Sequence, residues 1–203
     1  TIIMEWVNIG ANSTIQNGIE IGKRVTVAPG SNVTKSIPPY SKTMGNPLKI
    51  IGYNTGKHEM FPKNTLRSKD ILDIDLTEMP QVNDLRGSLT FGEFSKIIPF
   101  NAKRYFVIYD VPNHHIRGEH AHRKCHQFLI CLKGKCKVML DNGKNTKIFE
   151  LMEPTKGLHI SPLIWATQFE HSKDAVLLVF ASDFYDSKDY IRDYEEFKKL
   201  CNL

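Results

Sequence analysis

The chain of 203 residues has few cysteines, and they are not spaced as a metal-binding or redox pair. Its four cysteines include no C-x-x-C motif. The four are Cys125, Cys131, Cys136 and Cys201, and three of them fall in strand-like segments. We therefore expect buried free thiols and a protein of a reducing compartment.

Long apolar runs are also absent. No stretch approaches the roughly 20 apolar residues that cross a bilayer, and no signal peptide is recognisable. We expect no membrane partner and a cytoplasmic location.

The sequence contains no run of charge of one sign. The formal net charge is +5, but lysines and arginines are scattered among acids and form no track for a phosphate backbone. We expect no nucleic-acid partner, whereas a few arginines gathered in one pocket would bind a diphosphate. With 41% hydrophobic and 24% charged residues, the chain is of ordinary globular composition, with room for one full domain and a smaller piece.

An internal repeat occupies residues 1–52. An aliphatic residue recurs at every sixth position, which is the spacing of one flat face of a triangular coil. The members are Ile9, Ile15, Ile21, Val27 and Val33. The repeat predicts a short left-handed parallel β-helix.

The end of this segment, residues 31–40 and 45–49, resembles the last coils of hexapeptide-repeat acyltransferases. The resemblance implies a histidine general base in an earlier coil, but no histidine precedes His58. We interpret the segment as a truncated remnant of such an enzyme. The alternative is a transferase that acts only when assembled into an oligomer.

A change of composition separates this repeat from the rest of the chain. Residues 53–69 are rich in Gly, Asn, Thr, Pro and Lys, which is typical of a linker. From residue 70 to 203, short segments rich in β-branched and aromatic residues alternate with turn residues, which predicts an all-β cupin or jelly-roll barrel. The expected strands are 88–95, 103–109, 127–132, 136–140, 147–151, 157–161 and 175–182, with a hairpin turn at 141–143. The only expected helix is 189–200, from its helical spacing of apolar residues.

The densest cluster of reactive side chains lies at residues 117–122, with the sequence RGEHAH. In a strand His120 and His122 point to the same side, so both imidazoles can enter one cavity. The spacing resembles the first cupin motif. The acid that completes a metal site is replaced by Gln127, and Ala166 stands where a further histidine would be expected, so we predict no metal and no other cofactor.

Five motifs in order resemble the WxcM-like dTDP-4-keto-6-deoxyglucose 3,4-ketoisomerases. They are DLRGSL at 84–89, IPF at 98–100 with Lys103 and Arg104, RGEHAH at 117–122, ASDFYD at 181–186 and DYIRDY at 189–194. The resemblance implies a metal-free jelly roll, a dimer that exchanges N-terminal strands, a dTDP-linked 4-keto-6-deoxy sugar as substrate, and a role in deoxyaminosugar synthesis for surface glycans. A trimer formed through the β-helix segment is the alternative assembly.

The same resemblance implies roles for individual residues. Proton transfer from C-3 to C-4 through an enediolate needs a base near neutrality, which imidazole supplies. By this analogy His122 is the principal base, His120 its partner, and Arg117 stabilises the enediolate. The expected substrate-binding residues are Arg86 and Arg104 for the diphosphate, and Gln127, Trp165 and Tyr185 for the sugar or the base.

Three alternatives remain open at this point. A sugar-nucleotide 3,5-epimerase shares the barrel and the histidine base, and a non-catalytic cupin would bind a nucleotide sugar without converting it. In the third alternative, the two histidines are interior residues that only form hydrogen bonds and have no catalytic role. Ala166 departs from the histidine that relatives often carry after the tryptophan, which leaves the configuration of the product at C-4 open.

Overall fold

The computed structural model describes residues 1–54, 71–112 and 115–201, and its contacts divide the chain into two compact units. The first unit contains residues 1–67 with 114–116, and the second contains 68–113 with 117–203. Most of the expected linker lies outside the described residues. Each unit is mainly β, and each is described separately below.

Unit 1 is a stack of very short parallel strands. Three pairs join residues 18 positions apart: Ile2 with Glu20, Asn8 with Thr26, and Thr14 with Asn32. Its strands are β1 (Ile2–Ile3), β2 (Asn8–Ile9), β3 (Thr14–Ile15), β4 (Glu20–Ile21), β5 (Thr26–Val27), β6 (Asn32–Val33), β7 (Ser41–Met44) and β8 (Lys49–Tyr53). A spacing of 18 is what three six-residue faces per coil require. The handedness of the coil stays a prediction.

The sixfold aliphatic repeat forms the core of this unit. Ile21, Val27 and Val33 are almost fully buried, and Ile9 and Ile15 pack against them. β7 and β8 form an antiparallel pair after the last parallel strand. The aliphatic side chains of the six-residue repeat therefore form the hydrophobic core of unit 1.

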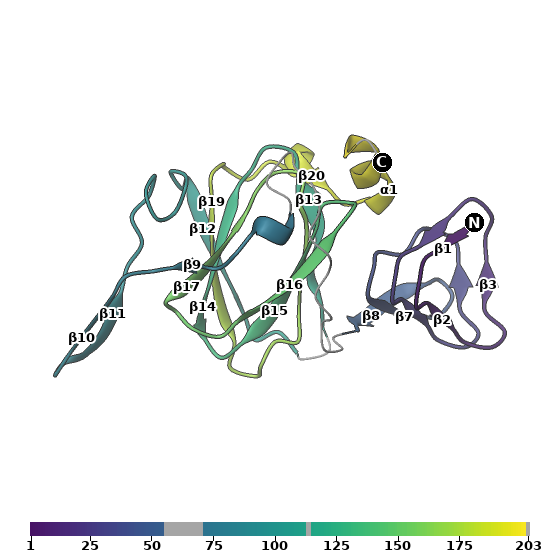
Figure 1. Cartoon of the computed structure of the whole chain (residues 1–203), viewed down its shortest axis with the longest axis horizontal. Coiled ribbons are helices and arrows are strands. Elements are labelled where there is room, and N and C mark those ends of the chain that lie inside the picture. Colours follow the sequence, from purple (N-terminus) through teal and green to yellow (C-terminus); the bar gives the residue numbers. More distant parts are fainter. Residues whose placement is uncertain (55–70, 113–114, 202–203) are drawn as a thin grey trace. The chain divides into compact units, whose positions relative to one another are not determined.

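Unit 2 contains two five-stranded sheets (Figure 1). One has the order β12-β19-β14-β17-β9 and the other β16-β15-β18-β13-β20. The strands are β9 (Thr77–Glu78), β10 (Gln81–Asp84), β11 (Gly87–Thr90), β12 (Arg104–Tyr109), β13 (Arg117–His122), β14 (Gln127–Lys133), β15 (Cys136–Asp141), β16 (Thr146–Leu151), β17 (Lys156–Ile160), β18 (Trp165–Phe169), β19 (Val176–Ala181) and β20 (Tyr190–Ile191). Short 3-10 turns are η1 (Ile71–Asp73) and η2 (Ser187–Asp189), and the helix is α1 (Tyr194–Leu200).

The main core lies between the two sheets. Leu129 and Val179 come from one sheet, Val138 and Leu140 from the other, and all four are essentially buried. α1 covers the outer face of the second sheet, where Phe197 packs with neighbouring strand residues. Alternation along the strands thus separates an inner face, which carries the core, from an outer face.

The mainly β, cupin-like class is confirmed, and the two five-stranded sheets are the double-sheet arrangement of a jelly roll. One expectation about the elements needs correction. The helix begins at Tyr194 rather than at residue 189, because Asp193 caps it by accepting a hydrogen bond from the Glu196 amide. Within the described residues, no helix has the length and apolarity needed to cross a membrane.

Candidate active site

A β-bulge in β13 orients the side chains of the two histidines. The register against β18 shifts between Gly118 and His120, leaving Glu119 as the extra residue, and both Gly118 (φ 83°) and Glu119 (φ 54°) have positive φ. After the bulge, His120 and His122 share the inner face, and their ring centroids lie 5.0 Å apart. The sequence expectation of two imidazoles facing one side is met in this geometry.

His122 is held at both ring nitrogens. Its Nδ1 lies 2.8 Å from Oδ2 of Asp189, and its Nε2 lies 3.0 Å from the side-chain nitrogen of Gln127. A carboxylate only accepts, so Nδ1 carries the proton, and Nε2 accepts from the Gln127 amide. His122 is therefore a neutral ring whose basic lone pair is on Nε2.

Burial lowers the pKa of His122, and two arginines lower it further. The hydrogen bond and the negative charge of Asp189 oppose these effects, whereas Arg104 and Arg192 add to the effect of burial. The side chain is only 5% exposed. The imidazole is thus in the unprotonated form that a general base needs at neutral pH.

His120 is fixed by its own strand. Its Nδ1 donates to the carbonyl oxygen of Gly118 at 2.9 Å, a contact that the bulge permits. Burial lowers the pKa of His120 to about 4, the Gly118 bond opposes the shift, and charge on His122 and Arg192 lowers it further. His120 is therefore a second neutral imidazole, and its Nε2 carries the lone pair.

Tyr190 forms one wall beside both histidines. Its ring centroid lies 4.9 Å from that of His120 and 4.4 Å from that of His122, because β20 pairs with β13 at His122. The guanidinium of Arg192 lies 4.4 Å from the same ring, in a cation–π contact.

Arg104 brings a second positive charge to this wall. One of its terminal nitrogens donates to the Tyr190 hydroxyl at 3.3 Å, and the guanidinium lies 5.5 Å from the ring of Tyr185. Its Nε is buried without a hydrogen-bond partner among the described residues. This donor is available to an oxygen of a bound anion.

Comparison with known proteins identifies the type of site. The family model described as FdtA: WxcM-like, C-terminal matches residues 72–202. The chain belongs to this family. A curated relative, the TDP-4-oxo-6-deoxy-alpha-D-glucose-3,4-oxoisomerase of Aneurinibacillus thermoaerophilus, is 44% identical over 119 residues, which are 59% of this chain and 86% of the relative.

A solved structure of the same kind is also similar. It is a variant of the 3,4-ketoisomerase QdtA from Thermoanaerobacterium thermosaccharolyticum, in complex with TDP-4-keto-6-deoxyglucose. The sequences are 40% identical, the TM-score is 0.62, and the match covers 64% of this chain and 94% of that one. The predicted resemblance is thereby confirmed for unit 2.

The N-terminal residues match a different class of enzyme. A dTDP-3-amino-3,6-dideoxy-alpha-D-galactopyranose 3-N-acetyltransferase of Aneurinibacillus thermoaerophilus is 47% identical over 53 residues. The match spans 26% of this chain and 28% of that enzyme. The acyltransferase-like character of the segment before the WxcM-like domain is thus supported.

Five of the eight residues expected in this WxcM-like site lie together. His120, His122 and Gln127 form the inner row, and Arg104 and Tyr185 lie beside Tyr190. Three sequence expectations differ from this arrangement, and each has a structural reason.

Trp165 lies on the opposite face of its sheet from the two imidazoles. It packs with Ala121 and with Phe197 of α1 on the outer face of its sheet, because Ala121 alternates with the inward histidines. Ala166, the next residue, is directly opposite His120 and joins the main core. The position after the tryptophan, rather than the tryptophan itself, is beside the imidazoles.

Arg117 and Arg86 are also away from the imidazoles. Arg117 is exposed at the start of β13 and forms no ion pair with a described residue. The pKa of His171 is lowered mainly by burial and, to a smaller extent, by the charge of Arg117. Arg86 lies at the tip of the β10–β11 hairpin, where its 90% exposed side chain pairs with Asp84 at 2.6 Å. Because the β10–β11 hairpin is separate from the two five-stranded sheets, Arg86 at its tip does not lie beside the histidines of those sheets.

Sequence reasoning missed Asp189, Tyr190 and Arg192. All three lie in the DYIRDY motif, which carried the family resemblance but was interpreted as helix. The missed signal is Asp193 followed by Glu196, the spacing of an N-terminal capping box, which places the helix start after this motif. The residues before it are then free to form β20 and line the site.

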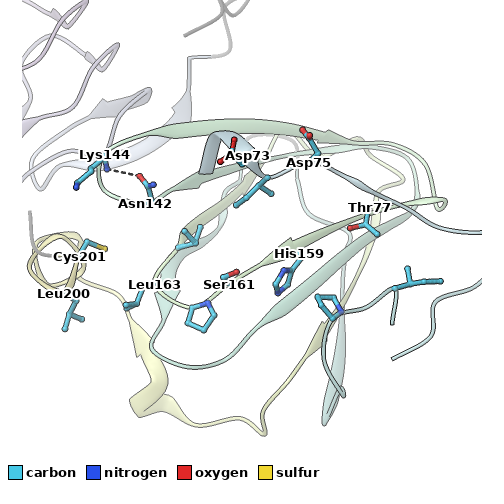
Figure 2. A pocket seen from close by; sticks show the side chains of 15 residues that line it. Asp73, Asp75, Thr77, Asn142, Lys144, His159, Ser161, Leu163, Leu200 and Cys201 are labelled. Atoms are coloured by element: carbon cyan, nitrogen blue, oxygen red, sulfur yellow. Dashed lines mark hydrogen bonds between the residues drawn. The ribbon is translucent and has the colours of Figure 1, made fainter. Parts of the chain in front are cut away.

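A separate cavity opens at the end of this domain (Figure 2). Its volume is 780 Å³, and its walls include Asp73, Asp75, Asn142, Ser161 and His159. None of the eight expected site residues lines it. This cavity is therefore distinct from the histidine site.

Proposed function

We propose that unit 2 converts TDP-4-keto-6-deoxyglucose to a TDP-3-keto-6-deoxyhexose by proton transfer between neighbouring carbons. The observation that carries the proposal is the pair of neutral imidazoles, one of which is held between Asp189 and Gln127. The similar ketoisomerases, one with the 4-keto sugar bound, support the substrate class. We propose a cytoplasmic enzyme of deoxyaminosugar synthesis for surface glycans.

The first chemical step is the removal of the C-3 proton. Nε2 of His122 accepts this proton when the substrate displaces the Gln127 amide, and an enediolate forms between C-3 and C-4. Charge on the imidazolium is stabilised by Asp189, whose Oδ2 already bonds Nδ1. A positioned base of this kind contributes roughly 10²–10⁴-fold to the rate.

The second step returns a proton to C-4. The hydroxyl at C-3 becomes the ketone, the former ketone oxygen gains a proton, and the formula of the sugar is unchanged. His120 and the Tyr190 hydroxyl are placed to move protons between the two oxygens, and Arg192 stabilises the negative oxygen. We propose Arg192 for that role in place of Arg117.

The diphosphate is proposed to bind at Arg104 and at an arginine from a second subunit. Arg86 lies on a hairpin that extends away from the sheets in Figure 1, and Leu85 beside it is fully exposed. The edge strand β12 exposes Tyr105 and Tyr109. We propose a homodimer in which each hairpin packs on the partner and brings Arg86 to the partner's site.

The activity is tested by incubating the protein with TDP-4-keto-6-deoxyglucose in deuterated water and following deuterium at C-4 by NMR. We expect incorporation by the wild-type protein, with and without a chelator. His122→Asn should keep the fold, as judged by circular dichroism, and lose the incorporation. Absence of incorporation by the wild-type protein would eliminate the isomerase.

Complementation tests the shared site. Arg86→Ala and His122→Asn should each be inactive alone, because each lacks one part of every site. After unfolding and refolding as a mixture, the two variants form hybrid dimers with one complete site, and activity returns. If Arg86 served its own subunit, or if the protein were monomeric, no activity would return.

Unit 1 resembles an acetyltransferase, but its residues argue against acetyl transfer. Its match to an N-acetyltransferase for a TDP-3-aminosugar favours acetyl transfer to the amine that a transaminase would make from the 3-keto product. The residues before His58 contain no histidine to act as base. We therefore propose that this segment does not transfer acetyl groups by itself. Acetylation of a TDP-3-amino sugar by acetyl-CoA, lost on deletion of residues 1–60, would contradict this.

A further inference from the structure

A cluster of three different ligand-type side chains lies beside the histidine pair. One ring nitrogen of His122, the sulfur of Cys125 and a carboxylate oxygen of Asp189 all lie within 4.8 Å of one another. The three residues are 5%, 3% and 6% exposed. They therefore form a buried group of nitrogen, sulfur and oxygen donors, unlike an exposed acidic cluster.

The loop between β13 and β14 builds this cluster by wrapping around Asp189. The amide of Arg123 donates to the carbonyl oxygen of Asp189, and the amide of Lys124 donates to its Oδ1, both at 2.9 Å. The next residue along this loop is Cys125. Because the backbone fixes Asp189 from two sides, the thiol and the carboxylate are held near each other before any ion arrives.

The donor set matches the coordination chemistry of zinc. Zinc binds histidine nitrogen and carboxylate oxygen at about 2.0–2.2 Å and thiolate at about 2.3 Å, so its tetrahedral ligands are about 3.3–3.6 Å apart. The three donor atoms lie within 4.8 Å of one another, which is close to these separations. Three protein ligands leave a fourth position for water.

The charges of the cluster also balance. The complex of a divalent cation with a neutral imidazole, a thiolate and a carboxylate has no net charge. The thiol releases one proton when the ion binds. Arg104, which contacts both Cys125 and Tyr190, therefore faces no net positive charge. The neighbouring guanidinium does not exclude the ion.

We propose that His122, Cys125 and Asp189 form an inhibitory site for zinc and similar thiophilic divalent cations. The inhibition rests on the proposed function, because it removes the base of that reaction. An ion on Nε2 occupies the lone pair, and an ion on Nδ1 moves the proton of the neutral ring to Nε2. In both cases Nε2 no longer accepts a proton from the sugar.

The other close histidine pair does not offer an equal site. His126 Nδ1 and His159 Nε2 lie 3.0 Å apart, with Phe100 beside both rings. Among the described residues, no carboxylate or thiol completes a three-ligand group with them. A sulfur ligand therefore distinguishes the proposed site from this pair.

Cobalt(II) is the probe for binding, because it replaces zinc and reports a thiolate ligand by a charge-transfer band in the near ultraviolet. We expect the wild-type protein to develop this band with one equivalent of cobalt, and zinc to remove it. Cys125→Ser should lose the band, and Cys201→Ser, which changes a half-buried thiol outside the cluster, should keep it. The same band in Cys125→Ser, or no band in the wild-type protein, would overturn the proposal.

Activity measurements test the inhibition separately. Zinc should inhibit the wild-type ketoisomerase and a chelator should restore it, whereas Cys125→Ser should retain its basal activity and require at least roughly tenfold more zinc. Equal sensitivity of the two proteins, or loss of wild-type activity in chelator alone, would contradict an inhibitory site. The cobalt spectrum remains decisive even if deuterium exchange eliminates the proposed reaction.

Discussion

At the scale of single residues, His122 is held as one tautomer of a neutral imidazole. Asp189 accepts a hydrogen bond from Nδ1–H and the Gln127 amide donates to Nε2, so that the tautomer is fixed by two buried side chains. At position 127, where the cupin pattern has a metal-binding acid, the glutamine amide donates to Nε2 and so helps to fix the tautomer of His122.

Asp189→Asn is expected to reduce kcat by roughly 10²-fold, because the amide no longer fixes the Nδ1 proton or stabilises the imidazolium. KM should change little, since Asp189 contacts Nδ1 of His122 and the substrate is proposed to bind on the Nε2 side of the ring. Asp189 opposes the lowering of the pKa of His122, so its loss moves the acid limb of the rate profile to lower pH. The profile of kcat/KM against pH measures this shift.

A matched control for this variant is Asp186→Asn. Asp186 lies in the same loop and caps η2 by accepting from the Lys188 amide, which asparagine also does. We expect wild-type kcat and an unchanged pH profile. An equal loss of activity in both variants would show that the loop, rather than the carboxylate at 189, is responsible.

At the scale of elements, the bulge in β13 connects backbone shape to the site. A Cβ atom at Gly118 would lie 2.6 Å from the carbonyl oxygen of Ala166, and φ there is +83°. Only glycine allows β13 to approach β18 so closely while its own carbonyl turns toward the His120 ring. The local distortion is therefore part of the site.

Gly118→Ala should destabilise unit 2 by about 1–3 kcal/mol and lower kcat by more than a stability loss explains, because β13 must move away from β18. Urea unfolding and steady-state kinetics provide the two measurements. Gly87→Ala is the control for stability: it also has positive φ (+126°), but nothing lies within 4 Å of its added Cβ. If the two variants lost equal stability, the contact with Ala166 would have no role.

The sequence predicted elements where local pattern decides the structure. Strands 103–109 and 136–140 agree closely with β12 and β15, since alternation and the turn at Gly143 specify them. The sequence did not specify the face of Trp165, because an aromatic residue fits either side of a sheet, and here α1 packs on it. β20 was missed because two residues carry no period, and only its pairing with β13 makes it a strand.

The same distinction applies to the site. His120 and His122 follow from spacing along one strand, and the resemblance to the cupin motif adds Gln127, which lies on the facing sheet. Asp189 reaches His122 across 67 positions of chain. No local pattern encodes that contact. Long-range partners of this kind require the fold.

At the scale of the whole molecule, the two units have separate hydrophobic cores. Ile21 and Val27 are buried in the first, and Leu129 and Leu140 in the second. Unit 2 also contains every residue placed at the proposed site. The pH dependence of its stability should therefore originate within that unit.

Acidification should destabilise unit 2 through His120. Its folded pKa of about 4 is below the ordinary 6.5, so between these values the unfolded chain binds a proton that the folded protein does not. The contribution is fully present above pH 6.5 and is lost as pH falls toward 4, with a total on the order of 3 kcal/mol. Urea unfolding of the wild-type protein and His120→Gln across this range measures the difference. Because glutamine does not titrate, the stability of the variant should fall less steeply below pH 6.5, and parallel curves would show that His120 is protonated equally in both states.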